Sequence, residues 1–491
     1  MSTTARPLSE TKRKLLQEYA SGRAIQPTAA LTRRPPGINA GLSLAQEQVW
    51  RHALAVKGVP SFYNESITIH RTGPLELHIL ERSFTEVIRR HEIWRTTFRA
   101  SNLGPIQIVH PAPSIVAIPA IDLSALEESA RQQEAIRLAT EYARQPFDLE
   151  AGPLVRALLI TLNERTHKLF VTMHQAVVDG ISAHRIFPQE LTTLYSALEE
   201  GVASPLPELE FQFADFAYND RQRPYGREWN RHLEYWRTHL GGFIGNRWIE
   251  AICRAPAQEA SGTIQPFTIP PALHSRLQQM CREEQVTLFA TLLAGLALLF
   301  ATYRDDEEVA IATVTPTGRK RPETQQMLGY FLNSVALRLP LSSQATIRQL
   351  LHQCREVTLQ ALENDDIPFE LIDQELRTGL TFGHGCMLPL ALTVAPSLPP
   401  LPLGWHQTPM DIDTGWAKWP MYLELRETPG GILGRAQYRT SWFTPATVST
   451  LLQAFKGILD FIACHAGEHI STVHRCLHQA LLPEGLEIHK Q

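Results

Sequence analysis

The stretch Val171–Ser182, VTMHQAVVDGIS, carries the most information about the fold. An apolar run that ends in His174 and Gln175 is typical of a buried strand, and Asp179-Gly180 then predicts a turn into a helix. An unpaired buried carboxylate is costly, so Asp179 requires an arginine or several hydrogen-bond donors nearby. A glycine after it allows the backbone to approach a ligand closely or to take a left-handed turn.

Two interpretations of this stretch stay open when it is considered alone. His174 fits a hydrogen-bonded core histidine and Asp179 a helix cap as well as either fits catalysis. Only the rest of the sequence can distinguish a structural from a catalytic role for His174 and Asp179.

Helices and strands are mixed along the whole chain. Apolar residues recur at helical spacing in several segments. These are Leu44–Val56, Leu77–His91, Leu288–Tyr303 and Ile347–Glu363. Shorter segments rich in Ile, Val, Thr and Phe predict strands. These are Glu65–His70, Leu169–Met173, Val309–Val314, Gly329–Leu339 and Pro389–Val394. The pattern predicts a mixed α/β (α+β) protein.

Composition excludes several classes of function. The chain has 491 residues, 44% of them hydrophobic, which predicts two globular domains. A net charge of −4 from 46 basic and 50 acidic residues leaves no global field to hold nucleic acid or an anionic membrane. Six scattered cysteines and an N-terminus without an apolar signal core favour the cytoplasm and no disulfides. The apolar run Thr287–Tyr303 is short for a membrane span, so we expect a buried core helix.

The chain divides into two halves of similar size. A polar, proline-containing stretch, Gly201–Glu210, and the aromatic run after it place the boundary around residues 205–240. We expect an N-terminal helix and linker in residues 1–40, one lobe in 41–215 and a second lobe with crossover segments in 216–485. The proline-rich loop 396–404 predicts a surface crossover. Four aromatic residues near the boundary predict packing between the lobes. They are Phe211, Phe213, Phe216 and Tyr218.

The stretch at 171–182 resembles the HHxxxDG motif of the superfamily that contains nonribosomal peptide synthetase condensation domains and chloramphenicol-acetyltransferase-like enzymes. Five further strings resemble the other condensation-domain motifs in the family's order. They are LSLAQEQVW at 42–50, RHEIWRTTF at 90–98, FADFAYND at 213–220, GYFLNSVALR at 329–338 and NDDIPFELI at 364–372. Six strings in register over residues 42–372 argue against coincidence.

The resemblance implies two chloramphenicol-acetyltransferase-like lobes that form a V-shaped pseudo-dimer with a central tunnel. Acyl or peptidyl carrier proteins would present donor and acceptor on phosphopantetheine at opposite mouths, without a bound cofactor or metal. The sequence has no Gly-Gly-x-Ser attachment site and no glycine-rich nucleotide loop. We therefore expect the carriers to act in trans on a monomer, or the chain to be a domain of a larger synthetase.

The resemblance also assigns roles to residues of the motif. The second histidine, which orients or deprotonates the attacking amine, is replaced here by Gln175, and His174 matches the first, more structural histidine. Asp179 matches the aspartate of a salt bridge that shapes the site, with Arg319 of PTGRKRPE as its expected partner. Gly180 matches the glycine that faces the thioester.

Two more residues of the matching strings, Ser182 and Asn333, are expected to line the tunnel and contact substrate. A carboxamide has no usable basicity, so Gln175 cannot take a proton. A positioned base supplies about 10²–10⁴-fold, whereas aligning two tethered reactants supplies effective molarities of about 10⁵–10⁸ M. We therefore predict an acyltransferase that forms amides rather than esters, unless another group such as His174 supplies the base.

Other functions remain as alternatives. A condensation fold without turnover would serve as a docking platform for carrier proteins or tailoring enzymes, and an ester-forming chain-release acyltransferase is a second alternative. Heterocyclization domains carry DxxxxD, and epimerization domains keep the second histidine, so His174 and Gln175 count against both. The cysteines and histidines of residues 464–479 fit no standard zinc spacing. His384 and Cys386 share a strand face by geometry alone, which is weak support for a nucleophile pair.

Overall fold

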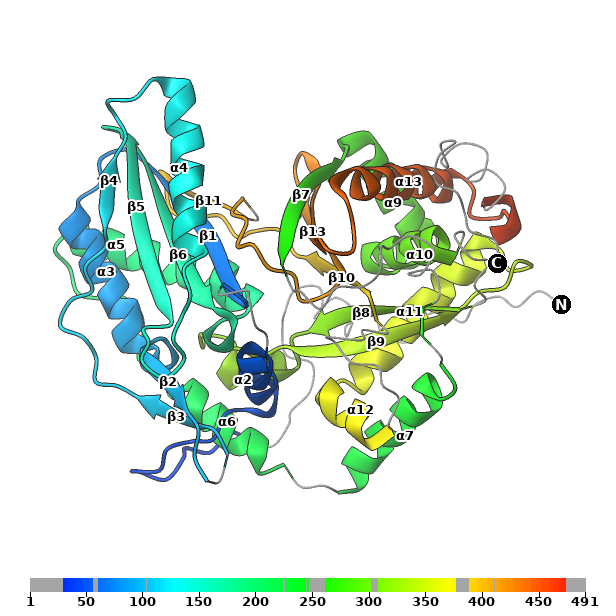
Figure 1. Ribbon diagram of the computed structural model, residues 1–491, viewed down its shortest axis with the longest axis horizontal. Helices are drawn as coiled ribbons and strands as arrows, with labels where there is room; N and C mark the ends of the chain where they lie inside the picture. The colour runs from blue at the N-terminus through cyan, green and yellow to red at the C-terminus, as the bar shows by residue number, and fades with distance from the viewer. Residues whose placement is uncertain are drawn as a thin grey trace.

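The computed structural model describes residues 30–55, 61–102, 104–223, 226–243, 245–246, 261–301, 308–376, 388–409 and 411–473. These residues form two lobes of mixed helix and sheet, which lie side by side and spread apart toward the top of the view in Figure 1. The predicted fold class and V-shaped arrangement of lobes are confirmed.

The N-terminal lobe is built on a sheet with the strand order β11-β1-β6-β5-β4. The strands are β1 (Asn64–Thr72), β4 (Ala120–Asp122), β5 (Val155–Asn163), β6 (Thr166–His174) and β11 (Trp405–Thr408). Successive side chains of a strand point to opposite faces. Val171 of β6 packs with α3 (Leu77–Arg90) and α5 (Phe187–Glu199), whereas Phe170 packs with α4 (Glu128–Ala143). Helices therefore cover both faces of this sheet, and a separate antiparallel pair, β2 (Thr96–Arg99) and β3 (Ile106–Val109), lies beside it.

The C-terminal lobe is built on a sheet with the strand order β7-β13-β12-β10-β8-β9. The strands are β7 (Gly262–Ile269), β8 (Glu308–Thr315), β9 (Asn333–Pro340), β10 (Leu390–Ala395), β12 (Met421–Thr428) and β13 (Gly431–Arg439). The helices packed with it are α9 (Pro271–Glu283), α10 (Leu288–Ala301), α11 (Ile347–Glu363) and α13 (Pro445–Cys464). Nearly every residue of α10 is buried, which confirms the predicted core helix. Among the described residues, α13 is long and apolar enough to cross a membrane, and α9 and α10 reach that length and composition only as a pair bent by 107°. All three helices pack together in the core of this lobe.

The two lobes are joined by segments that cross between them. The loop 396–404 runs from β10 to β11, which pairs with β1 in the sheet of the other lobe, so the proline-rich loop makes the expected crossing. The remaining helices are α2 (Leu44–Ala55), α6 (Phe213–Arg221), α7 (Arg227–Leu240) and α12 (Phe369–Leu376). The expected boundary between residues 215 and 216 falls inside α6, which is continuous and packs with the N-terminal core.

The aromatic run at the boundary packs between segments far apart in the sequence. The rings of Phe213 and Phe216 lie 4.9 and 4.8 Å from the ring of Phe331. Gly329 has φ of +154°, and a Cβ there would overlap the ring of Phe213. The close approach of this segment to α6 therefore requires a glycine. These aromatic residues pack the halves of the chain together, as the sequence predicts.

Candidate active site

The motif stretch lies where β6 ends, at the junction of the two lobes. β6 ends at His174, a 3₁₀ turn follows, and a π-helical turn leads into α5. The Gln175 N–H donates to the Tyr63 carbonyl at 2.8 Å. The side chain of Gln46 on α2 donates to the Ala176 carbonyl at 2.8 Å. The string at 42–50 therefore holds the turn that presents Gln175.

Asp179 and Arg319 form a buried ion pair between the halves of the chain. Arg319 Nε donates to Asp179 Oδ2 and Nη2 to Oδ1, both at 2.9 Å. Both side chains are at most 1% exposed. The Ser182 N–H donates to the same carboxylate at 2.7 Å, and the guanidinium lies 4.4 Å from the centre of the Phe331 ring. Each charge is compensated by an opposite charge and hydrogen bonds, which burial requires.

Ser182 does not line a tunnel, contrary to the expectation from the sequence. Its side chain is fully buried, and its Oγ accepts from Arg319 Nη2 at 2.6 Å and from the Gly329 N–H at 3.1 Å. The hydroxyl also donates to the Gly329 carbonyl at 3.1 Å. Ser182 therefore belongs to the support of the ion pair.

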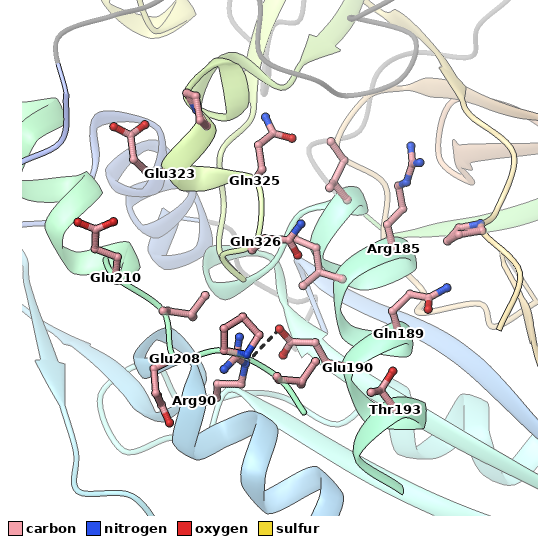
Figure 2. Close-up of a pocket in the computed structure, with 17 residues that line it drawn as sticks. Arg90, Arg185, Gln189, Glu190, Thr193, Glu208, Glu210, Glu323, Gln325 and Gln326 are labelled. Carbon is pink, nitrogen blue, oxygen red and sulfur yellow. Dashed lines mark hydrogen bonds and ion pairs between the residues drawn. The ribbon is translucent and has the colours of Figure 1, made fainter. Parts of the chain in front are cut away.

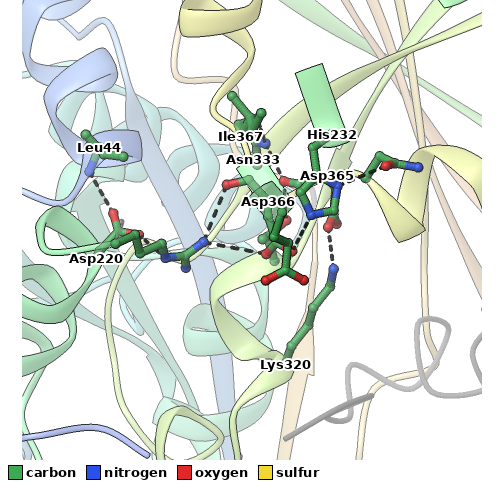
Figure 3. Close-up of polar contacts among 12 residues, drawn as sticks. Leu44, Asp220, His232, Lys320, Asn333, Asp365, Asp366 and Ile367 are labelled. Atoms are coloured by element: carbon green, nitrogen blue, oxygen red, sulfur yellow. Dashed lines mark hydrogen bonds and ion pairs between the residues drawn. The ribbon is translucent and has the colours of Figure 1, made fainter. Parts of the chain in front are cut away.

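Asn333 also fails to reach the cavity between the lobes. Its Nδ2 donates to the carbonyls of Asp365 and Ile367, each at 2.7 Å (Figure 3). Its Oδ1 accepts from the N–H groups of Ser334 and Phe369 at 2.8 and 3.3 Å. Because the side-chain amide is saturated by backbone groups, Asn333 shapes the turn before α12 rather than binding substrate.

His174 lies on the opposite side of the motif from Gln175. It borders a hollow of about 610 Å³ that Trp50, Phe62 and Phe147 also line. Its Nδ1 accepts from the Ala176 N–H at 3.2 Å, and burial lowers the pKa of His174 to about 3. A histidine of such low basicity does not supply the base that the sequence left open. The structural interpretation of His174 is the one that fits.

Gln175 faces a cavity of about 190 Å³ between the lobes. Asp179 and Gly180 of the motif line it together with residues of β1, β10, β12 and β13. Gln175 Nε2 donates to Glu65 Oε1 at 3.3 Å. His174 and Gln175 line different cavities, so the motif separates two cavities that flank it.

Charged side chains that the sequence did not single out line the same cavity. Glu65 of β1 lies beside Gln175, and Glu424 of β12 accepts from Arg435 of β13 at 2.7 Å. Arg426 of β12 also lines the cavity. The sequence assigns Glu65 only to a strand. Nothing in the polar sequence of that strand, NESITIHRT, sets Glu65 apart, and only the pairing of β1 with β6 places it beside the motif.

Gly180 is exposed to the cavity, and a Cβ on it would meet no other atom within 4 Å. Its φ is not positive, so the left-handed turn considered from the sequence is wrong, and close approach of a ligand remains.

We expect Gly180→Ala to leave the unfolding free energy within about 1 kcal/mol of native, because alanine suits a helical start. If the thioester passes there, the same variant loses about 10²-fold in turnover, since small misplacements are costly. Denaturant titration and single-turnover rates measure the two effects, and an unchanged rate would remove Gly180 from the site.

A larger hollow of about 700 Å³ lies beside α5, and Figure 2 shows its lining. Arg90 and Glu190 form part of its wall and are joined at 3.2 Å. Gln175, Asp179 and Gly180 do not line this hollow. The cavity of about 190 Å³ that Gln175 and Gly180 line is therefore the candidate active site.

The remaining sequence candidates receive no support as a site. His384 and Cys386 lie outside the described residues, as does the end of the segment 464–479. Within the ranges that the structure describes, no group of three or more His, Cys, Asp or Glu side chains is placed to hold a metal ion.

Comparisons with known proteins agree on one family. A family model described as Condensation domain matches residues 39–478. The chain is 33% identical over 436 residues to chondramide synthase of Chondromyces crocatus, covering 88% of this chain and 11% of that protein. It is 31% identical over 446 residues to a linear gramicidin synthase from Brevibacillus parabrevis, covering 88% of this chain and 6% of that protein. The chain thus spans about a tenth or less of these relatives.

Solved structures share the fold. The first condensation domain of the calcium-dependent antibiotic synthetase, bound to a substrate analogue, matches with a TM-score of 0.77 and 20% identity, covering 91% of this chain and 100% of that one. The X-domain in complex with OxyB from teicoplanin biosynthesis matches with a TM-score of 0.75 and 23% identity, covering 92% and 98% of the two chains.

Proposed function

Because the chain belongs to the condensation-domain family, we propose that it joins a carrier-bound acyl thioester to an amine and forms an amide bond in nonribosomal peptide or hybrid polyketide biosynthesis. The observation that carries this proposal is the cavity between the lobes, into which Gln175 and Gly180 face. The ion pair of Asp179 and Arg319 braces that cavity. Such a preorganised site accelerates a reaction between two tethered substrates by alignment.

The substrates that we propose are acyl or peptidyl chains on the phosphopantetheine arms of carrier proteins. Cavities on both sides of the motif support delivery of a donor and an acceptor from opposite faces. The first relatives are synthetases of which this chain covers 11% and 6%, so neighbouring domains or separate proteins would supply the carriers in the cytoplasm.

The proposed role of Gln175 is to hold the acceptor nitrogen by a hydrogen bond. A neutral amine attacks a thioester without prior loss of a proton, whereas a hydroxyl group depends strongly on a base. The low basicity of His174 supports amide over ester formation, because that residue does not replace the missing histidine as a base.

A reconstitution with loaded carriers tests the function. Donor acyl-carrier protein and acceptor aminoacyl-carrier protein are mixed with native protein, Gln175→Ala or Gln175→His, and the acceptor is followed by intact mass, with several acyl donors. We expect native protein to form product and Gln175→Ala to be slower by about tenfold, the worth of one hydrogen bond in the transition state.

A second candidate function, a docking platform without turnover, is favoured by the absence of a histidine at position 175. One structural neighbour is an X-domain solved in complex with OxyB, and a docking role of that kind is the alternative function for this chain. Product from Gln175→His without product from the native chain would favour the platform. Product from the native chain favours the enzyme.

A further inference from the structure

Glu65 is a carboxyl group in the candidate active site to which the family motif assigns no role. It lies on β1, directly across from the last residues of β6, where Glu65 pairs with Met173. Its Oε1 accepts from Gln175 Nε2 at 3.3 Å, and both side chains line the cavity between the lobes. The side chain that Gln175 contacts from the position of the missing histidine is therefore a carboxyl group.

The neighbours of Glu65 come from each strand or loop packed against it. Arg435 on β13 and Glu424 on β12 are the charged groups that act on the pKa of Glu65, and they pair with each other at 2.7 Å. Tyr330 and Tyr422 also interact electrostatically with Glu65. Burial raises the pKa of both phenols, so they stay neutral. Because Glu424 engages Arg435, that guanidinium compensates Glu65 only in part.

The burial of Glu65 has a measurable consequence. Removal from water raises the pKa of Glu65 to about 7, Arg435 opposes the shift and Glu424 adds to it. A general base works best when its pKa lies near the working pH. A carboxyl group of this kind is half ionised near neutral pH and accepts a proton from an ammonium group readily.

We propose that Glu65 accepts the proton which the acceptor amine loses when its nitrogen attacks the thioester, while Gln175 holds that nitrogen. The proposal rests on the proposed condensation function and names the catalytic base of the same site. Gln175 binds Glu65 through its Nε2, and within the described residues its Oε1 forms no hydrogen bond. That oxygen is free to accept from an N–H of the amine.

The chemical step balances without a further reactant. The amine nitrogen forms a bond to the thioester carbon, and the ammonium of the tetrahedral intermediate passes one proton to the Glu65 carboxylate. The carbon–sulfur bond then breaks, and the departing thiolate takes that proton to become the free phosphopantetheine thiol. The products are one amide and one thiol.

The test is the pH profile of single-turnover amide formation from about pH 5.5 to 9, with loaded carriers, for native protein, Glu65→Gln and Glu65→Asp. We expect Glu65→Gln to be slower by about 10²–10⁴-fold and to lose a rise in rate near pH 7 that the native protein shows. The acceptor amine also titrates and contributes its own limb, that is, its own rise in rate with pH. The limb assigned to Glu65 is the one that disappears in Glu65→Gln. Glu65→Asp keeps a carboxyl group, and we expect it to keep that limb at a reduced rate.

Glu424→Gln is the matched control, since it removes a carboxylate from the same cavity. Burial opposes the ionisation of Glu424, but the Arg435 and Arg426 guanidiniums lower its pKa, so the group is ionised throughout the range. Its loss also removes a charge that raises the pKa of Glu65 and releases Arg435, so we expect the limb to remain but to move to lower pH. A Glu65→Gln variant with the native rate and native limb would overturn the role of Glu65 and leave the condensation function intact. A native protein that makes no amide with any donor would overturn the condensation function and, with it, the base.

Discussion

Asp179→Ala and Arg319→Ala are each expected to lower the unfolding free energy by about 3–5 kcal/mol, because either change leaves a buried charge without its partner. The carboxylate accepts two hydrogen bonds from the guanidinium at 2.9 Å and one from the Ser182 N–H at 2.7 Å. All of these donors are buried with it. A loss of this size is a large share of the stability of an ordinary domain, so soluble yield should fall as well.

Urea titration followed by tryptophan fluorescence measures this effect, and Arg89→Ala is the control. Arg89 pairs with Glu86 and Glu208 on the exposed side of α3, where we expect a loss below about 1 kcal/mol. If Arg319→Ala lost no more than Arg89→Ala, the buried pair would not brace the lobes. The interpretation of Asp179 as a structural anchor of the motif would then have to be abandoned.

Glu65→Gln is expected to stabilise the protein at pH 8 and to leave its stability unchanged near pH 4.5. Burial raises the pKa of Glu65 from 4.5 to about 7, so the folded chain holds this proton more tightly than the unfolded chain. The stability that Glu65 contributes is therefore complete below the unfolded pKa and is lost as the pH rises toward 7. Glutamine imitates the protonated carboxyl group at every pH. At pH 8 the unfolding free energy of Glu65→Gln should therefore exceed that of the native protein by at most about 3 kcal/mol.

Thermal or urea unfolding of native protein and Glu65→Gln over this pH range provides the measurement, and it requires no substrate. Glu424→Gln should behave in the opposite way, because the neighbouring arginines outweigh burial and hold the pKa of Glu424 below its usual value. That variant leaves Arg435 without its carboxylate and should destabilise the protein at pH 8. A Glu65→Gln variant destabilised equally at every pH would mean that Glu65 is an ionised partner of Arg435.

Most elements of the fold follow from patterns in the sequence. The strands predicted at Glu65–His70 and Leu169–Met173 are parts of β1 and β6, and the helix predicted at Ile347–Glu363 is α11. These segments carry the period of their structure because one face of each is buried. The boundary expected between residues 215 and 216 falls inside α6, because a helix can continue where the composition of the chain changes.

Two expectations about the site failed for one physical reason. Ser182 and Asn333 belong to strings that resemble family motifs, and both are polar residues next to the site. The side chain of each instead forms its hydrogen bonds with buried backbone groups or with Arg319. A sequence shows which groups can form hydrogen bonds, but not which of those bonds the packed backbone has already formed.

The sequence by itself determined the family, the mixed architecture, the loss of a basic group at position 175 and the need of Asp179 for an arginine or several hydrogen-bond donors. Only the tertiary structure decided that Gln175 donates to Glu65, that His174 faces the other side, and that Glu424 occupies Arg435. These contacts join β1, β6, β12 and β13, which are distant along the chain. Their chemistry depends on burial and on charges brought together by strand pairing, and neither quantity is a property of a local stretch of sequence.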